Sequence, residues 1–177
     1  MRFRLGILIC FLLALPALAQ QPPLTRDQTR ELVHASLARY GMKDLNTEFR
    51  QSDKQPYNFV GLLKTGLKNS DSVEIVVSIT ADQTIGFRIF PHFNGAYINL
   101  DKVKDANGLM RKMLYFNDRN FLFWGADGTS DVFSGYTFTL ESGYPEEAFH
   151  IVLRSITTLD KFVGEMRPFI DGSAAAP

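Results

Sequence analysis

Apolar and polar residues alternate with a period of two through much of the first half of the chain. Between residues 73 and 79 every second position is Val or Ile, Glu74 and Ser78 lie between them, and residues 85–89 repeat the pattern. This period is typical of strands with one buried face. We also predict a strand from Tyr57 to Leu63 and a weaker one over residues 47–50. The connections between these runs are short, which favours antiparallel pairing because parallel strands need long crossovers.

Three other segments have apolar residues at helical spacing. The first is predicted to begin at Thr25, where Gln28 completes a capping box, and to end at Gly41. The second is predicted from Asp101 or Asp105 to Phe116, with Asn117 as its stop. Its expected apolar face consists of Ala106, Leu109, Met110, Met113 and Leu114.

The third predicted helix is the clearest element of the sequence. Pro145 suits a first helical position, and two glutamates follow it, where the helix dipole favours negative charge. We expect Ile156 at the buried centre of this helix and Asp160 off the buried face, with little energetic weight. The apolar residues recur at steps of three and four and form one continuous stripe that should pack on the sheet: Phe149, Val152, Ile156, Leu159, Val163, Met166 and Ile170.

Two late apolar runs, residues 121–124 and 136–140, predict a β-hairpin. Both faces of its first arm are apolar, because successive side chains of a strand point to opposite sides. A wet second face would expose an apolar patch that monomers rarely tolerate, so another segment, a second copy or a partner should cover it. Four residues are therefore candidates for binding a partner: Phe93 and Tyr97 near an earlier strand end, and Leu122 and Trp124 in the hairpin.

The N-terminus has the pattern of a secretory signal peptide. Arg2 and Arg4 precede an apolar run, and Ala17 and Ala19 place small residues where signal peptidase needs them. We expect residues 1–19 to be removed, leaving a tether over 20–23, a single domain over 24–171 and a disordered tail over 172–177. The apolar run is too short to span a bilayer, so no stable membrane span is expected after cleavage. The protein is accordingly expected in the periplasm or outside the cell.

The residues that remain after cleavage show little catalytic or metal-binding chemistry. Seventeen basic residues stand against nineteen acidic ones, a balance that argues against a nucleic-acid partner. The sole cysteine lies in the leader, and the three histidines lack metal-ligand spacing. Glu146 and His150, four residues apart, are interpreted as an exposed ion pair, and the Asp-rich segment 127–131 as a tight turn. We therefore predict no metal, no cofactor and no enzymatic activity.

The order helix, three or four strands, helix, two strands, helix resembles that of the YbjN family, whose fold is similar to the type III secretion chaperones. The resemblance rests on residues 114–120, which read Leu-Tyr-Phe-Asn-Asp-Arg-Asn, followed by the hairpin and the last helix. It covers nearly all of residues 24–170. It implies an α+β fold in which an antiparallel sheet packs with three helices. The family is described as bacterial sensory transduction regulators, a name that implies no established chemistry.

These observations favour a non-enzymatic, exported domain of the YbjN type. Its predicted role is to bind an unknown protein or peptide, in a regulatory or chaperone-like manner, and a homodimer is one form that this partner can take. The alternative is a periplasmic small-molecule sensor or carrier with a pocket between the sheet and its helices. A third hypothesis, an enzyme whose site only the fold assembles, has no motif to support it.

Overall fold

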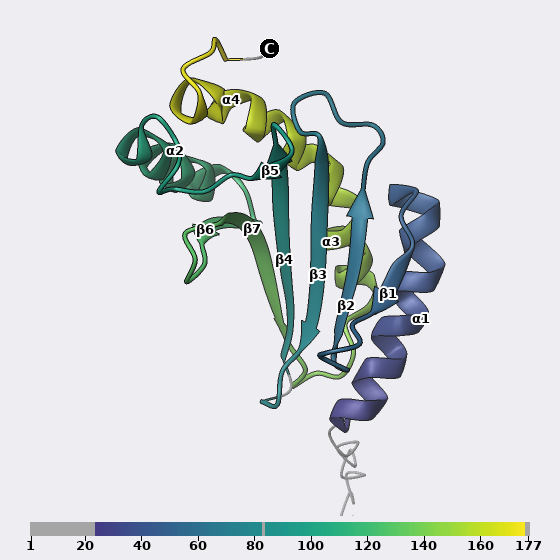
Figure 1. Cartoon of the computed structure of the whole chain (residues 1–177). Coiled ribbons are helices and arrows are strands. Elements are labelled where there is room, and N and C mark those ends of the chain that lie inside the picture. The colour runs from purple at the N-terminus through teal and green to yellow at the C-terminus, as the bar shows by residue number, and fades with distance from the viewer. Residues whose placement is uncertain (1–23, 83, 176–177) are drawn as a thin grey trace, which may run out of the picture.

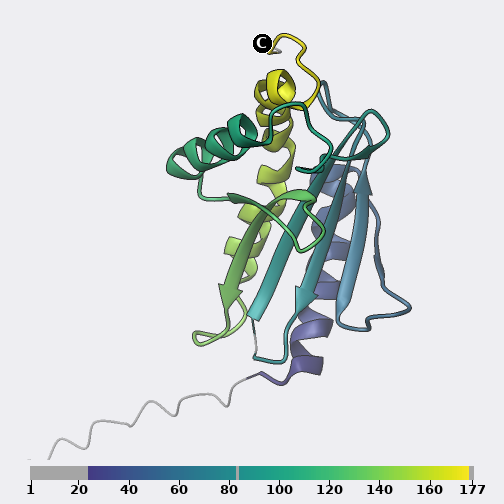
Figure 2. The same ribbon diagram turned by 60° about the vertical axis from the view of Figure 1, so that its left-hand side comes forward.

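The structure is a computed structural model, and it describes residues 24–82 and 84–175. The predicted leader, its cleavage site and the tether lie outside the described residues. One face of an antiparallel sheet is covered by a layer of helices, as the two views in Figure 1 and Figure 2 show. Seven strands form the sheet in the order β1-β2-β3-β4-β7-β6, with the short β5 paired to β4.

The order of elements confirms the predicted α+β fold and its helix–strand order. The structure adds the short strand β5, which follows β4 through a tight turn at Asn94 and Gly95 with positive φ at both residues, and it divides the predicted last helix. The elements are α1 (Arg26–Leu45), β1 (Phe49–Gln51), β2 (Asn58–Leu63), β3 (Ser72–Ile79), β4 (Thr84–Phe93), β5 (Ala96–Tyr97), α2 (Ala106–Arg119), β6 (Phe123–Ala126), β7 (Val132–Thr139), α3 (Glu146–Ser155), the 3-10 helix η1 (Ile156–Leu159) and α4 (Asp160–Ile170).

The core lies between the sheet and the helix layer. The alternating residues of β3 and β4 that were predicted to be buried are nearly inaccessible to solvent, and Phe59 on β2 and Phe138 on β7 join them. Phe87 packs at the centre, with its ring 4.9 Å from that of Phe149 on α3. The period of two in the sequence therefore identifies the face of the sheet that the helices cover.

Helix α1 begins as predicted and ends later. Thr25 and Gln28 form the capping box, each side chain bonding to the backbone of the other. The prediction that Gly41 ends the helix is wrong, because the helix continues to Leu45 and Asn46 takes the left-handed position. Gly41 instead gives room to Phe49: a Cβ at this position would lie 2.8 Å from the Phe49 ring.

Helix α2 begins at Ala106 with the Asp105 side chain as its cap, and it runs past the predicted stop at Asn117 to Arg119. Its buried face is formed by Leu109, Met113 and Phe116. Met110 and Leu114, which were predicted to be part of that face, are exposed, Leu114 by 69%. The predicted apolar face is thus partly wrong, since the helix packs on β6 and α4 with the side that carries Phe116.

The last helical region is divided by a 3-10 segment between α3 and α4. Every residue of the predicted stripe except Ile170 is buried, and Ile156 is completely so. The expectation for Asp160 is wrong, because its side chain is also buried, at 6% exposure. Its carboxylate accepts hydrogen bonds from the backbone amides of residues 68, 69 and 70 and so fixes the β2–β3 loop to the helix layer.

Candidate binding face of the sheet

The face of the sheet turned away from the helix layer is the candidate site, and we call it the open face. Its side chains come from the strand positions between the buried ones. In the register of the sheet Val76 on β3 lies opposite Arg88 on β4, and Ser78 lies opposite Gly86. In the described part of the chain no helix packs over these central positions, because α1, α3 and α4 lie on the other side (Figure 1).

Of the four predicted binding residues, only Tyr97 lies on the open face. It pairs with His92 across the β4–β5 turn, and their rings are 4.5 Å apart. Phe93 points to the helix side instead, where it packs against the core beneath the Arg167 guanidinium, which lies 5.6 Å from the centre of its ring. Phe93 is therefore part of the packing between β4 and α4.

Leu122 and Trp124 are core residues, so the structure does not offer them to a partner, and of the three expected ways of covering their face it shows coverage by another segment of the same chain. Leu122 is fully buried and Trp124 is 4% exposed, in contact with Phe116 on α2 and Phe162 on α4. The chain itself covers this face of the hairpin arm. It is the other pair, Phe121 and Phe123, that is exposed.

Asn117 explains why this face is the buried one. Its side-chain amide donates to the Trp124 carbonyl and accepts from the Trp124 amide, at 3.1 and 2.6 Å. These two bonds imitate a neighbouring strand along the outer edge of β6. They fix the arm against α2 and also protect an edge that would otherwise be open to pairing with another chain.

An aromatic cluster occupies one end of the open face, and we define it as Phe90, Tyr97, Phe123 and Phe133. The Phe133 ring lies 5.6 Å from Phe90 and 5.8 Å from Phe123, and Phe90 lies 5.6 Å from Tyr97. Phe123 is 41% exposed and rests on the backbone of Gly135, where a Cβ would lie 2.8 Å from its ring. A glycine is therefore required beneath it.

The other three members of the cluster, Phe90, Phe123 and Phe133, were not among the four predicted binding residues. They lie in runs whose apolar residues fall on both faces, so periodicity alone does not show on which side they point. A signal was present at Gly135, since a glycine inside a strand often marks a close approach of another group.

A hollow of about 650 Å³ lies on the open face beside the cluster. Hydroxyl and amide side chains, including Asn58, Ser78 and Thr137, line it together with Phe90, Phe123 and Phe133. The exposed Leu62 and the half-buried Val60 and Val76 extend the apolar part of the face across β2 and β3. The open face thus combines apolar side chains with hydrogen-bonding groups.

The rim of the open face is formed by the β6–β7 turn. The segment Ile98–Leu100 pairs with Ser130–Val132 through backbone bonds and an isolated bridge between Asn99 and Asp131. Within the turn Asp127 accepts hydrogen bonds from the Thr129 hydroxyl and from two backbone amides. Although desolvation acts in the opposite direction, these bonds hold the pKa of Asp127 below its ordinary value. The Asp-rich segment is therefore the tight turn that was predicted.

Ser72 and His92 form a polar pair at the aromatic end, with the Ser72 hydroxyl 3.0 Å from Nδ1 of His92. A serine nucleophile needs a base that a third group orients. Here the other ring nitrogen, Nε2, is buried without a hydrogen-bond partner in residues 24–82 and 84–175, so no third group among them orients the His92 ring.

The hydroxyl of Tyr97 lies at the same end of the open face. Its burial, with the Glu74 carboxylate nearby, raises the pKa of Tyr97 to about 12. At neutral pH the hydroxyl is therefore protonated and can donate a hydrogen bond, but it cannot act as a base.

The described ranges contain no group of three or more His, Cys, Asp or Glu side chains placed to hold a metal ion. The same ranges contain no helix that is both long and apolar enough to cross a membrane.

The predicted ion pair between Glu146 and His150 is wrong, because both side chains bond to α1. Glu146 accepts from Arg39 at 2.9 Å and from the Tyr40 hydroxyl at 3.1 Å. Nε2 of His150 lies 2.6 Å from the Asp44 carboxylate, and its ring stacks on Tyr40. These contacts join α1 to α3 within the helix layer and leave the open face unaffected.

No protein-family model matches the chain, and no curated protein matches it. Among solved structures the chain is similar to one from the crystal structure of the ExsC–ExsE complex. The two chains share 15% sequence identity at a TM-score of 0.48, and the match covers 84% of this chain and 98% of that one.

Proposed function

We propose that this protein is an exported, non-enzymatic domain that binds a polypeptide on the open face of its sheet. The observation that carries the proposal is the exposed part of the aromatic cluster, Tyr97 and Phe123, together with the exposed Leu62 on β2. The rings of Tyr97 and Phe123 lie against the buried Phe90 and Phe133. Exposed apolar surface that adjoins hydrogen-bonding groups is typical of surfaces that another protein covers. The polypeptide is a foreign partner or a second copy of this chain.

Two further parts of the proposal rest on the sequence. The leader over residues 1–19 supports export to the periplasm or beyond, and the motif around Asn117 supports membership of the YbjN type, with a regulatory or chaperone-like role. The structure gives that motif a physical function, since Asn117 and the residues after it fix the hairpin that carries Phe123. Intact-mass measurement of the exported protein tests the leader: a chain that begins at Gln20 is expected, and one that begins at Met1 would contradict it.

The alternative, a small-molecule carrier with a pocket between sheet and helices, has less support. The space between these layers is occupied by fully buried side chains such as Ile75, Phe87 and Phe149. The hollow of about 650 Å³ lies on the opposite side of the sheet. Native mass spectrometry of the purified protein distinguishes the two functions, because a carrier should retain a small ligand in the absence of any polypeptide.

Photo-crosslinking in living cells tests the binding face. A photoreactive phenylalanine analogue placed at Phe123, on the open face, should yield one discrete adduct. The same analogue at Ile151 is a matched control, because Ile151 is 40% exposed but lies on α3 in the helix layer. An adduct of twice the protein's mass would identify a second copy as the partner. Adducts from Ile151 alone, or from neither position, would refute the proposed face.

A further inference from the structure

The two charged side chains that line the hollow on the open face are both positive. Among residues 24–82 and 84–175, its lining includes two arginines, Arg26 and Arg88, and no aspartate or glutamate. The other polar side chains of the lining are neutral hydroxyls and amides, such as Gln55 and Thr137. The Asp82 carboxylate reaches the edge of the hollow, where it accepts hydrogen bonds from the hydroxyls of Thr80 and Thr84. The chain as a whole carries slightly more acidic than basic residues once the leader is removed, so this local excess of positive charge does not follow from its composition.

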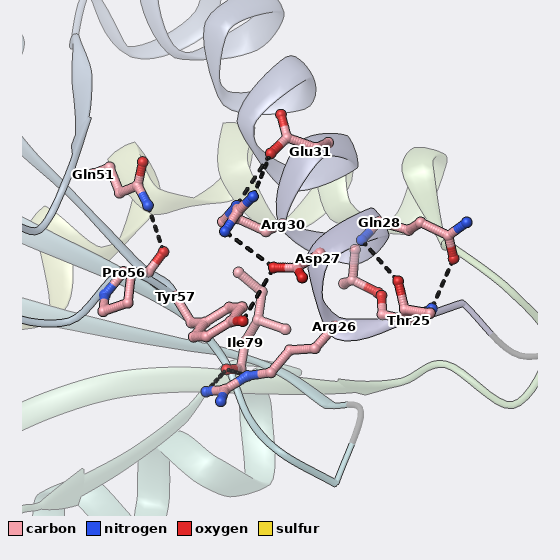
Figure 3. Close-up of polar contacts among 11 residues, drawn as sticks. Thr25, Arg26, Asp27, Gln28, Arg30, Glu31, Gln51, Pro56, Tyr57 and Ile79 are labelled. Carbon is pink, nitrogen blue, oxygen red and sulfur yellow. Dashed lines mark hydrogen bonds and ion pairs between the residues drawn. The ribbon is translucent and has the colours of Figure 1, made fainter.

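Arg26 is held in place before any ligand binds (Figure 3). Its Nε and Nη2 both donate to the Ile79 carbonyl, at 3.0 and 2.6 Å, and its guanidinium stacks on the Tyr57 ring at 3.6 Å. The Tyr57 hydroxyl in turn donates to Asp27, which is also paired with Arg30. Because a guanidinium has five N–H donors, these two bonds leave others available to a ligand.

Arg88 lies nearer the aromatic cluster and is exposed. Its guanidinium lies 5.0 Å from the centre of the Phe133 ring, which positions the charge by a cation–π contact. Within the described ranges it makes no ion pair. Asp127 on the rim interacts with it electrostatically and Glu74 lies on the neighbouring strand, but neither lines the hollow. Gly86 leaves open space on the floor next to it, with no atom near its Cβ position.

We infer that the hollow binds an extended, acidic polypeptide segment, with an Asp or Glu carboxylate at Arg88 and an adjacent apolar side chain against the aromatic cluster. This inference rests on the proposed function and names the chemistry of its partner. From Thr84 to Phe90 the face spans about 20 Å, the length of a six-residue strand. The hydroxyls of Ser78 and Thr137 can bond to the main chain of such a segment, while the arginines select its charge.

A peptide selection tests the inference. Random peptides of about 12 residues, long enough to cross the face, are displayed and selected on the purified protein. The selected sequences should contain several times more Asp and Glu than Lys and Arg. Arg88→Gln should weaken their binding about tenfold, because a charge-assisted hydrogen bond is lost. Arg111→Gln is the matched control, since Arg111 is an exposed arginine on α2, away from the hollow, and this change should leave binding intact. Arg88→Glu should shift the selection toward basic peptides.

The outcomes separate this inference from the proposed function. Peptides whose binding is lost in Phe123→Ser but that show no acidic enrichment would overturn the inference and leave the proposed face standing. Competition by free glutamate as strong as that by the peptides would overturn the polypeptide assignment in favour of a small anion. If no selected peptide depends on Phe123, the proposed face itself is wrong.

Discussion

Replacing Asp160 by alanine removes the carboxylate that joins the β2–β3 loop to the helix layer. Its oxygens lie 2.7 Å from the amide nitrogen of Lys68, 3.1 and 3.2 Å from that of Asn69, and 2.8 Å from that of Ser70. The loop lies close to the helix here, since a Cβ on Gly164 would be 2.8 Å from the Asn69 side chain. Alanine at position 160 would therefore leave three backbone donors without an acceptor, in a place with little room for water.

The expected loss of stability is large for the replacement of a single side chain. An unsatisfied buried donor costs about 1–3 kcal/mol, and three donors at one place cost more than one donor but less than the full sum, because such contributions are not additive. We therefore expect Asp160→Ala to lower the free energy of unfolding by about 3–5 kcal/mol. That is as much as Ile156→Ala, which should cost about 2–5 kcal/mol through lost burial and a cavity. Asp160→Asn should be intermediate, because its amide oxygen still accepts.

Urea denaturation followed by tryptophan fluorescence measures these losses. Trp124 is the sole tryptophan and is buried, so its emission reports unfolding directly. Asp53→Ala is the control, because Asp53 is exposed in the β1–β2 loop and should change the free energy of unfolding by less than about 0.5 kcal/mol. If Asp160→Ala unfolds within about 1 kcal/mol of that control, the carboxylate does not hold the loop and the reasoning is refuted.

Three further predictions concern other positions. Gly41→Ala should destabilise the protein by about 1–3 kcal/mol through overlap with Phe49, whereas this change usually stabilises a helix; a raised melting temperature would contradict the close contact. Asn117→Ala should cost about 1–3 kcal/mol and, by freeing the edge of β6, produce association that light scattering detects as concentration-dependent; an unchanged melt and a monomer at all concentrations would refute it. Tyr97 should ionise at about pH 12 in the difference between ultraviolet titrations of the wild type and Tyr97→Phe. Because its pKa is raised in the folded state, its stabilising contribution is complete below about pH 10 and is lost by about pH 12.

The strands and the buried helix stripe could be predicted from the sequence because one-sided burial produces a simple period. Where an element has one apolar face, as β3 and the region around Ile156 do, the spacing alone identifies that face. The ends of α1 and α2 could not be predicted in this way. Gly41 and Asn117 have the local chemistry of helix stops, but each makes a tertiary contact, with Phe49 and with the Trp124 backbone, that requires the helix to continue. The burial of Asp160 could not be predicted for the same reason, since its hydrogen-bond partners lie about ninety positions earlier in the chain.

The candidate site lies where the periodic signal is ambiguous. The arm from Phe121 to Trp124 is apolar on both faces, so two registers satisfy its pattern equally well, and a shift of one residue exchanges the core for the surface. The choice between them is made by the Asn117 amide, which fixes Trp124 inward and thereby leaves Phe123 on the open face. If the proposed binding requires Trp124 to point inward and Phe123 outward, the Asn117→Ala variant should give no crosslink from position 123. This loss should occur even at temperatures where the core remains folded. Loss of folding without any separate loss of crosslinking would assign Asn117 to stability alone.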